Sequence, residues 1–249
     1  MKIVYYKEKI RGEVMSITEI FLGNDRYKYI LDGLKFSLLV TAFAAVIGIL
    51  IGIIVALFRI SEFKPFKFLK ETKLDQWADF NPISFIAMLY IDLIRGTPAV
   101  VQLMIMHTVI FGKVSAPKLL VAGLAFGINS GAYVAEIIRA GIQGLDKGQM
   151  EAARSLGMGY GMSMYYIIIP QAIKNILPTL VSEFIILLKE TSIVGFIGGL
   201  DLLRSANVIT SQTYRGFEPL MAVALIYLAL TGIFTKLMRI VERRMRRSD

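Results

Sequence analysis

Long apolar runs alternate with short polar segments along the whole chain. Five of these runs exceed the roughly 18 residues that a bilayer-spanning helix needs. Their predicted bounds are 33–58, 82–111, 118–142, 163–188 and 219–238. The period-two alternation of β-strands is missing, and a backbone in lipid must satisfy its own hydrogen bonds. The pattern therefore predicts an all-α membrane protein, built as a five-span helical bundle.

The composition excludes a soluble enzyme and a disordered chain. Hydrophobic residues make up 55% of the 249 positions and charged residues only 19%, with a mean hydropathy of +0.61. The net charge of +9 comes mostly from the polar segments between spans and from the C-terminal end, where anionic lipid headgroups attract it. We therefore expect contact with membrane lipid and no binding of nucleic acid. Cysteine is absent and His107 is the single histidine, so we predict no catalytic residue and no metal site.

The runs divide the chain into three predicted regions. Residues 1–32 form a polar segment, with a short amphipathic helix at the interface over 17–29, residues 33–242 form the transmembrane domain, and 243–249 form a basic tail. Residues 198–218 are expected to make a polar outer connection. Five spans place the termini on opposite sides, and the basic C-terminal end favours a cytoplasmic C-terminus and an outer N-terminus. The basic residues near the N-terminus oppose this orientation: Lys2, Lys7, Lys9, Arg11, Arg26 and Lys28.

A short helix is predicted between the third and fourth spans, near residues 146–160. Asp146 and Gln149 have the spacing of a capping box, and the alanines that follow Glu151 favour helix. Three glycines then end the helix, at Gly157, Gly159 and Gly161. A helix this short does not persist alone in water, so we expect it to dock on another surface.

This segment resembles the EAA motif of bacterial ABC-importer permeases. The motif is EAA, three residues, G, nine residues, then I-x-L-P. It is matched here by Glu151, Ala152, Ala153, Gly157, Ile167 and Pro170, with Ile169 in place of the usual Leu. Further signatures are similar to those of the polar amino-acid branch: Arg95-Gly96-Thr97-Pro98 followed by Val101-Gln102-Leu103, then residues 135–139 and 188–192.

The resemblance implies the type I importer fold, covering the chain from about residue 33 onward. It implies a pair of permease subunits, either two copies or two homologous chains, on two cytoplasmic ABC ATPase subunits in a bacterial inner membrane. A binding protein outside the membrane would deliver the substrate. The chain has no P-loop, so ATP and Mg would be bound by the partner ATPase, with no cofactor in this chain. The residues implied in ATPase coupling are Gln149, Glu151, Ala152, Ala153, Leu156 and Gly157.

Polar residues inside the spans are candidate substrate contacts, because they are expensive in lipid. Pro98 removes a backbone donor and disfavours helix at Thr97, and Gln102 lies one turn further on. Broken spans are where transporters bind their substrates, so we predict that Thr97, Pro98 and Gln102 line the substrate site. The alternative is a proline kink that only shapes the bundle.

Glu183 is the fourth substrate candidate. It has no oppositely charged partner three or four residues away, so it is a candidate contact for an ammonium group or a cationic side chain. Ser182 stands where the amino-acid branch commonly has Asn, and a structural role for Glu183 is the alternative. Two pairs at i,i+3 spacing are expected to neutralise each other: Asp92 with Arg95, and Glu136 with Arg139.

The predicted function is therefore the permease subunit of an ATP-driven importer of polar amino acids. One alternative is an ion-coupled secondary transporter of small polar solutes, which usually carries inverted repeats that are not visible here. Another is a membrane hydrolase with Ser182 or Ser192 as nucleophile and Lys189 as base. Nothing in the spacing of those residues forces them together.

Overall fold

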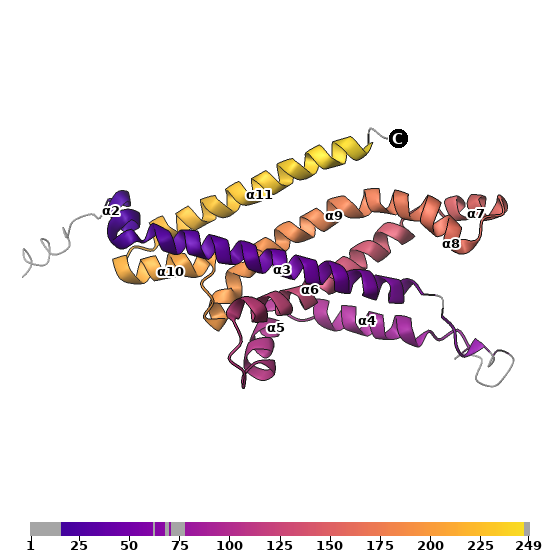
Figure 1. Ribbon diagram of the computed structural model, residues 1–249, viewed down its shortest axis with the longest axis horizontal. Helices are drawn as coiled ribbons and strands as arrows, with labels where there is room; N and C mark the ends of the chain where they lie inside the picture. The colour runs from indigo at the N-terminus through magenta and orange to yellow at the C-terminus, as the bar shows by residue number, and fades with distance from the viewer. Residues whose placement is uncertain (1–15, 62, 68–69, 71–77, 247–249) are drawn as a thin grey trace, which may run out of the picture.

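The computed structural model describes residues 16–61, 63–67, 70 and 78–246. Regular structure in that part of the chain is helical throughout, which confirms the predicted all-α class. The helices form an elongated bundle in which the longest elements run along its length (Figure 1). The predictions made for residues 1–15 and 247–249 lie outside the described residues.

The α-helices follow one another along the chain as α2 (Ile17–Leu22), α3 (Tyr27–Ile60), α4 (Pro82–Arg95), α5 (Ala99–Ile105), α6 (Lys118–Gln143), α7 (Lys147–Ser155), α8 (Tyr160–Ser163), α9 (Ile169–Glu190), α10 (Leu202–Thr213) and α11 (Phe217–Arg246). Two π-helical turns lie inside predicted spans, η4 (Met106–Ile110) and η5 (Met164–Ile168). Two 3₁₀ turns, η1 (Gly23–Asp25) and η6 (Thr191–Ile197), join neighbouring helices.

All five predicted runs are helical, but length and apolar composition support fewer than five spans. Three helices, α3, α6 and α11, are long and apolar enough to cross a membrane. The pair Pro82–Arg95 and Ala99–Ile110, bent by 102°, makes a fourth if it counts as one broken span. Helix α9 has 22 residues but is not among the helices that are apolar enough to cross a membrane by composition alone. Its charged residues are Lys174, Glu183, Lys189 and Glu190.

The contact between α3 and α6 is the most extensive in the bundle. Helix α3 has 34 residues, about 51 Å at 1.5 Å per residue, and begins at Tyr27, six residues before the predicted span. Apart from the adjacent Val40 and Thr41, its buried residues recur every three or four positions, and they include Gly48 and Gly52. A Cβ atom added at Gly52 would lie 2.4 Å from Cγ1 of Val134 on α6. Small residues thus let the two backbones approach closely, as is common between membrane helices.

The connection between α9 and α11, which includes the polar outer connection predicted over residues 198–218, is largely helical. It contains η6 and α10, and Asp201 caps α10 by accepting a hydrogen bond from the Arg204 N–H at 2.8 Å. Leu202, Ala206 and Ile209 are fully buried and form a small core with residues of α2, α3 and α11. Their i, i+4, i+7 spacing is a helical signal that was present in the sequence.

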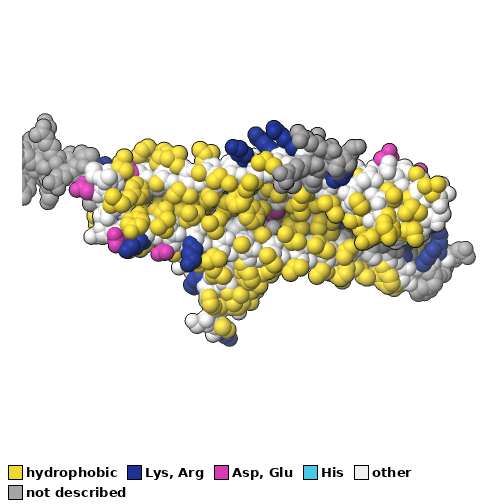
Figure 2. Space-filling model, turned by 45° about the horizontal axis from the view of Figure 1, so that its top comes forward, with side chains coloured by type: hydrophobic (Ala, Val, Ile, Leu, Met, Phe, Trp, Pro, Cys, Tyr) yellow, Lys and Arg dark blue, Asp and Glu magenta, His cyan; other side chains and the backbone are white. Residues whose placement is uncertain are grey.

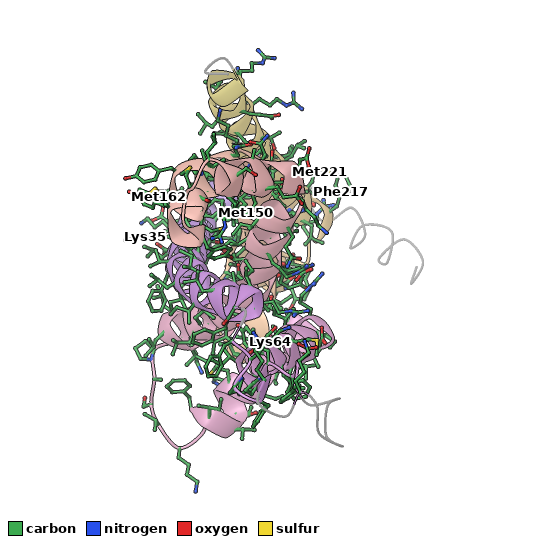
Figure 3. The ribbon with its side chains drawn as sticks, turned by 90° about the vertical axis from the view of Figure 1, so that its right-hand side faces the viewer. Lys35, Lys64, Met150, Met162, Phe217 and Met221 are labelled. Atoms are coloured by element: carbon green, nitrogen blue, oxygen red, sulfur yellow. The ribbon has the colours of Figure 1, made fainter. Side chains whose placement is uncertain are left out.

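The two ends of the bundle are formed by different segments (Figure 1). Helices α2 and α10 lie at one end, whereas α7 and α8 lie at the other. The C-terminal end of α3 and the N-terminal end of α4 lie toward the same end as α7 (Figure 1), and Figure 3 views the molecule from that end. The C-terminus of α11 also points toward this end. Hydrophobic side chains cover much of the length of the visible face, with charged side chains in small groups (Figure 2).

A valine at Gly52 should destabilise the protein. The added side chain would overlap Val134, and overpacking of this kind costs roughly 1–3 kcal/mol. The matched control is Gly232→Val on α11, where an added Cβ meets nothing within 4 Å. Thermal unfolding in detergent should show a lower midpoint for Gly52→Val alone. Equal midpoints for the two variants would contradict the close α3–α6 packing.

Candidate functional site

The predicted break in the second span is present. Helix α4 ends at Arg95, and the Gly96 N–H donates to the Asp92 carbonyl at 2.8 Å, which closes its last turn. Pro98 has extended backbone angles (φ −64°, ψ 137°) and begins α5. The chain turns by 102° across this break. Because Pro98 has no N–H to donate, the carbonyls at the end of α4 need other partners.

Gln102 supplies those partners from one turn into α5. Its Nε2 donates to the Ile94 carbonyl at 2.8 Å and to Oγ1 of Thr97 at 2.7 Å. The Thr97 carbonyl lies 3.2 Å from the same nitrogen. The side chain predicted to project into a substrate cavity is therefore also the group that satisfies the broken helix.

Two residues of α6 extend this arrangement toward α9. Nδ2 of Asn129 donates to Oε1 of Gln102 at 3.0 Å, and Oγ of the next residue, Ser130, donates to Oε1 of Glu183 at 3.1 Å. Thr97, Gln102 and Asn129 thus form one hydrogen-bonded group, and Ser130 forms a second with Glu183; the two groups are joined only through the adjacent residues of α6, and together we call them the polar cluster. Three of the four predicted substrate residues belong to it. The fourth, Pro98, is exposed beside Thr97.

Sequence reasoning missed Asn129 and Ser130. Both are buried, with 3% and 2% of their surfaces exposed. The available signal was two adjacent polar residues within an apolar run, since polar side chains inside spans are rare and usually functional.

Glu183 is buried on α9, with 9% of its surface exposed. Ser130 donates a hydrogen bond to one of its oxygens, and among the described residues no Lys or Arg forms an ion pair with it. A buried carboxylate without a cationic partner is costly. The position is therefore suited to receive a cation from outside the chain.

One of the two predicted intramembrane charge pairs forms. Nε of Arg139 donates to Oε2 of Glu136 at 2.9 Å, as expected. Asp92 and Arg95, however, form no ion pair with each other in the described part of the chain. The Arg95 guanidinium instead lies over the Tyr133 ring of α6, 5.4 Å from its centre. The prediction for this pair was wrong because an aromatic face on a neighbouring helix competes for the cation.

The predicted coupling segment forms α7 and the turn after it. Five of its six candidate residues are exposed: Gln149, Glu151, Ala152, Leu156 and Gly157. Ala153 is only 3% exposed and faces the chain's own bundle, where α7 contacts α8 and η5. Leu156 is 83% exposed, which is high for a large apolar side chain. Most of this surface is thus free to contact another protein.

Local interactions explain why α7 begins and ends where it does. Asp146 caps the helix by accepting from the Gly148 N–H at 2.9 Å. The predicted capping box is only half present, because the Gln149 amide oxygen accepts from Nε2 of Gln171 at 3.2 Å. Gly157 ends the helix with φ +84°, a conformation that side chains other than glycine rarely adopt.

The bundle combines a broken span, a polar cluster beside the break and an exposed helix, α7, at one end, and these features are typical of a membrane transport subunit. Residues 79–247 match the family of binding-protein-dependent transport system inner membrane components. The chain belongs to this family and is a multi-pass membrane protein. It is the permease subunit of an ABC importer, in which ATP hydrolysis is carried out by a partner. This membership rules out the alternatives of an ion-coupled secondary transporter and a membrane hydrolase.

Curated relatives match nearly the whole chain. It is 42% identical to the arginine transport system permease protein ArtQ of Bacillus subtilis strain 168, over 89% of this chain and 94% of the relative. It is 35% identical to the probable glutamine ABC transporter permease protein GlnM of the same organism, over 94% of this chain and the whole of the relative.

Solved structures support the fold. An amino acid ABC transporter crystallised with histidines is 47% identical, with a TM-score of 0.77 over 90% of this chain and 98% of that one. The MetNI methionine ABC transporter in an inward-facing conformation shares the fold at 16% identity. Its TM-score is 0.67, over 87% of this chain and 96% of that one. The predicted architecture of an ABC importer permease is therefore confirmed.

Replacing Gln102 with leucine should destabilise the break between α4 and α5. The change leaves the Ile94 carbonyl and the Asn129 amide without this partner, at a cost of roughly 1–3 kcal/mol. Asn129→Leu removes the same interhelical hydrogen bond. In a double-mutant cycle measured by unfolding in detergent, the double variant should therefore lose less stability than the sum of the two single losses. Strict additivity would mean that the two side chains do not interact.

Proposed function

We propose that this chain is the permease of an importer for polar amino acids in a bacterial inner membrane. The observation that carries the proposal is the polar cluster at the broken span, because it combines hydrogen-bonding groups with a buried carboxylate that lacks a cation. The relatives favour the same substrate class, since they include an arginine transport permease and a probable glutamine transport permease.

The proposed orientation has the N-terminus outside and the C-terminus in the cytoplasm. Three observations support it together. The C-terminal end of α11, the end of α3 that leads into the basic connection, and α7 all lie toward the same end of the bundle (Figure 1). Basic segments favour the cytoplasmic side. This orientation presents α7 to a cytoplasmic ATPase.

In the proposed site, the substrate approaches the break between α4 and α5. Thr97 and Pro98 are exposed there, and Gln102 is half-buried beside them. The zwitterionic part of an amino acid needs donors and acceptors, which Thr97 and Gln102 provide. An ammonium or cationic side chain would pair with Glu183, which offers the negative charge of the polar cluster.

In the proposed mechanism, an ABC ATPase binds ATP and Mg and moves α7 through its exposed residues. A second permease subunit, the same chain or a homologous one, completes the transport pathway. A binding protein outside the membrane delivers the amino acid, and ATP-driven closure of the ATPase pair changes the side to which the site is open. The coupling contact includes Gln149, Glu151, Ala152, Leu156 and Gly157, with Ala153 holding α7 on the bundle.

Gly157→Val should uncouple ATP hydrolysis from transport, because valine is strained at φ +84° and the turn after α7 must change. Gly161→Val is the matched control, since the space around Gly161 is equally open and its φ is not positive. The measurement is substrate-stimulated ATP hydrolysis in proteoliposomes that contain the assembled transporter. We expect the stimulation to be lost for Gly157→Val and kept for Gly161→Val. Unchanged stimulation in both would remove the coupling role.

Glu183→Gln should weaken uptake of cationic amino acids more than uptake of neutral ones. Glutamine keeps the size and the hydrogen bond with Ser130 but removes the charge, so roughly tenfold or more should be lost for the cations. Ser182→Ala is the control, because the Ser182 hydroxyl donates to the Pro178 carbonyl of its own helix at 3.1 Å. Uptake of each amino acid is measured in proteoliposomes. An equal loss for all substrates would point to a structural role for Glu183.

A further inference from the structure

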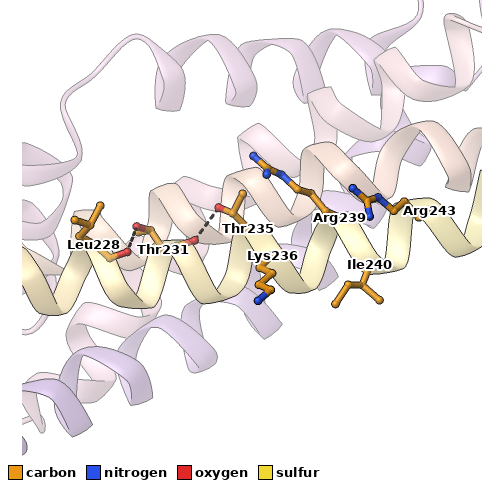
Figure 4. Close-up of a pocket in the computed structure, with 8 residues that line it drawn as sticks. Leu228, Thr231, Thr235, Lys236, Arg239, Ile240 and Arg243 are labelled. Atoms are coloured by element: carbon orange, nitrogen blue, oxygen red, sulfur yellow. Dashed lines mark hydrogen bonds between the residues drawn. The ribbon is translucent and has the colours of Figure 1, made fainter.

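The C-terminal half of α11 carries a basic stripe on a face that the rest of the chain leaves uncovered. Lys236, Arg239 and Arg243 follow Gly232 at intervals of four, three and four residues, so all four positions share one side of the helix. They line a hollow of about 550 Å³ together with Leu228, Thr231, Thr235 and Ile240 (Figure 4). Only 6% of the apolar 18-residue stretch of this helix is buried inside the protein.

This face points away from the bundle. Helix α11 packs on α9 through Phe234, whose ring lies 5.0 Å from that of Phe184 in an edge-to-face contact. Phe234 and Gly232 are two residues apart, which places them about 200° apart around the helix. The packed side and the hollow are therefore on opposite sides of α11.

The hollow changes from apolar to basic along the helix axis. At its inner end, the Thr231 hydroxyl donates to the Leu228 carbonyl at 3.1 Å, and the Thr235 hydroxyl donates to the Thr231 carbonyl at 2.7 Å (Figure 4). Both threonines thus satisfy their polar atoms within α11. An added Cβ at Gly232 would meet nothing within 4 Å, so the glycine leaves a notch in this face. The basic groups begin at Lys236, toward the helix end.

We propose that this face of α11 binds an anionic phospholipid. An acyl chain would lie along Leu228 and Gly232, and the phosphate headgroup would lie at Arg239 and Arg243. Gly232 and Arg239 are seven residues apart, about 11 Å along the helix. The apolar part therefore sits deeper in the bilayer than the basic part, in the order of a lipid's tail and headgroup.

The positive charge of this face favours an anionic phospholipid over other occupants. Six basic residues lie between 236 and 247 against one acidic residue, Glu242, and clusters of this density next to a span attract anionic lipids. The placement of the headgroup in the cytoplasmic leaflet rests on the proposed orientation, whereas the lipid contact itself does not.

The test uses the purified full-length chain in vesicles of phosphatidylcholine that contain phosphatidylglycerol. After extraction in detergent, native mass spectrometry counts the lipids of each class that remain bound. Each basic residue near the headgroup contributes about fivefold, so Arg239→Gln with Arg243→Gln should lower the preference for phosphatidylglycerol by roughly tenfold or more. The control is Lys67→Gln with Lys70→Gln, which removes the same charge from exposed residues outside the hollow and should lower the preference much less.

A second variant tests the hollow without changing the charge. It still tests lipid binding if the arginine variant fails to fold. Gly232→Phe fills the notch and should lower retention of phosphatidylglycerol, whereas Gly232→Ala should not. The proposal is overturned if both glycine variants retain the lipid equally, or if the lysine and arginine pairs have equal effects. It is also overturned if Gly232→Phe separates a dimer while lipid retention stays the same. The assay needs neither the ATPase nor an amino acid, so its outcome is independent of the transport proposal.

Discussion

Inside a bilayer, every backbone polar group must find a partner within the protein, and this constraint governs the centre of the molecule. The second span is interrupted at Gly96–Pro98, which leaves carbonyls at the end of α4 without helical donors. Gln102 donates to the Ile94 carbonyl, and Asn129 in turn donates to Gln102. The break is therefore stable because a neighbouring helix holds the side chain that satisfies it. The same hydrogen bonds gather polar groups at one place in an otherwise apolar interior.

Close packing of α3 against α6 gives this arrangement a fixed support. Glycines on both helices bring the backbones together, and the large side chain of Phe126 is fully buried in the core beside them. Helix α6 is thereby the element that contacts α3, α4, α5 and α9. Its adjacent residues Asn129 and Ser130 reach two different partners because successive side chains of a helix point about 100° apart.

The sequence contained most of the fold and part of the site. Apolar length predicted the helical runs, Pro98 predicted the break, and Gly157 predicted the end of α7, because each is a local constraint. The polar cluster required knowledge of which face of α6 meets which neighbour, so Asn129 and Ser130 were missed although they are polar. For the same reason Arg95 was paired with Asp92 rather than with the Tyr133 ring. The five-span count is not confirmed by length and composition alone, since α9, with its four charged residues, is not among the helices apolar enough to cross a membrane.

Helix α6 is unbroken from Lys118 to Gln143 and leads through Gly144 and two further residues into α7. Ser130 lies thirteen residues before Gln143, about 20 Å away along the helix axis. A rigid rod of this kind transmits a tilt at one end as a displacement at the other, without any relay of side-chain rearrangements. A tilt of α6 that displaces its last turn, next to α7, would shift the donors of Asn129 and Ser130 relative to α5 and α9. In the proposed mechanism, a displacement of α7 would therefore move Asn129 and Ser130 through one continuous helix.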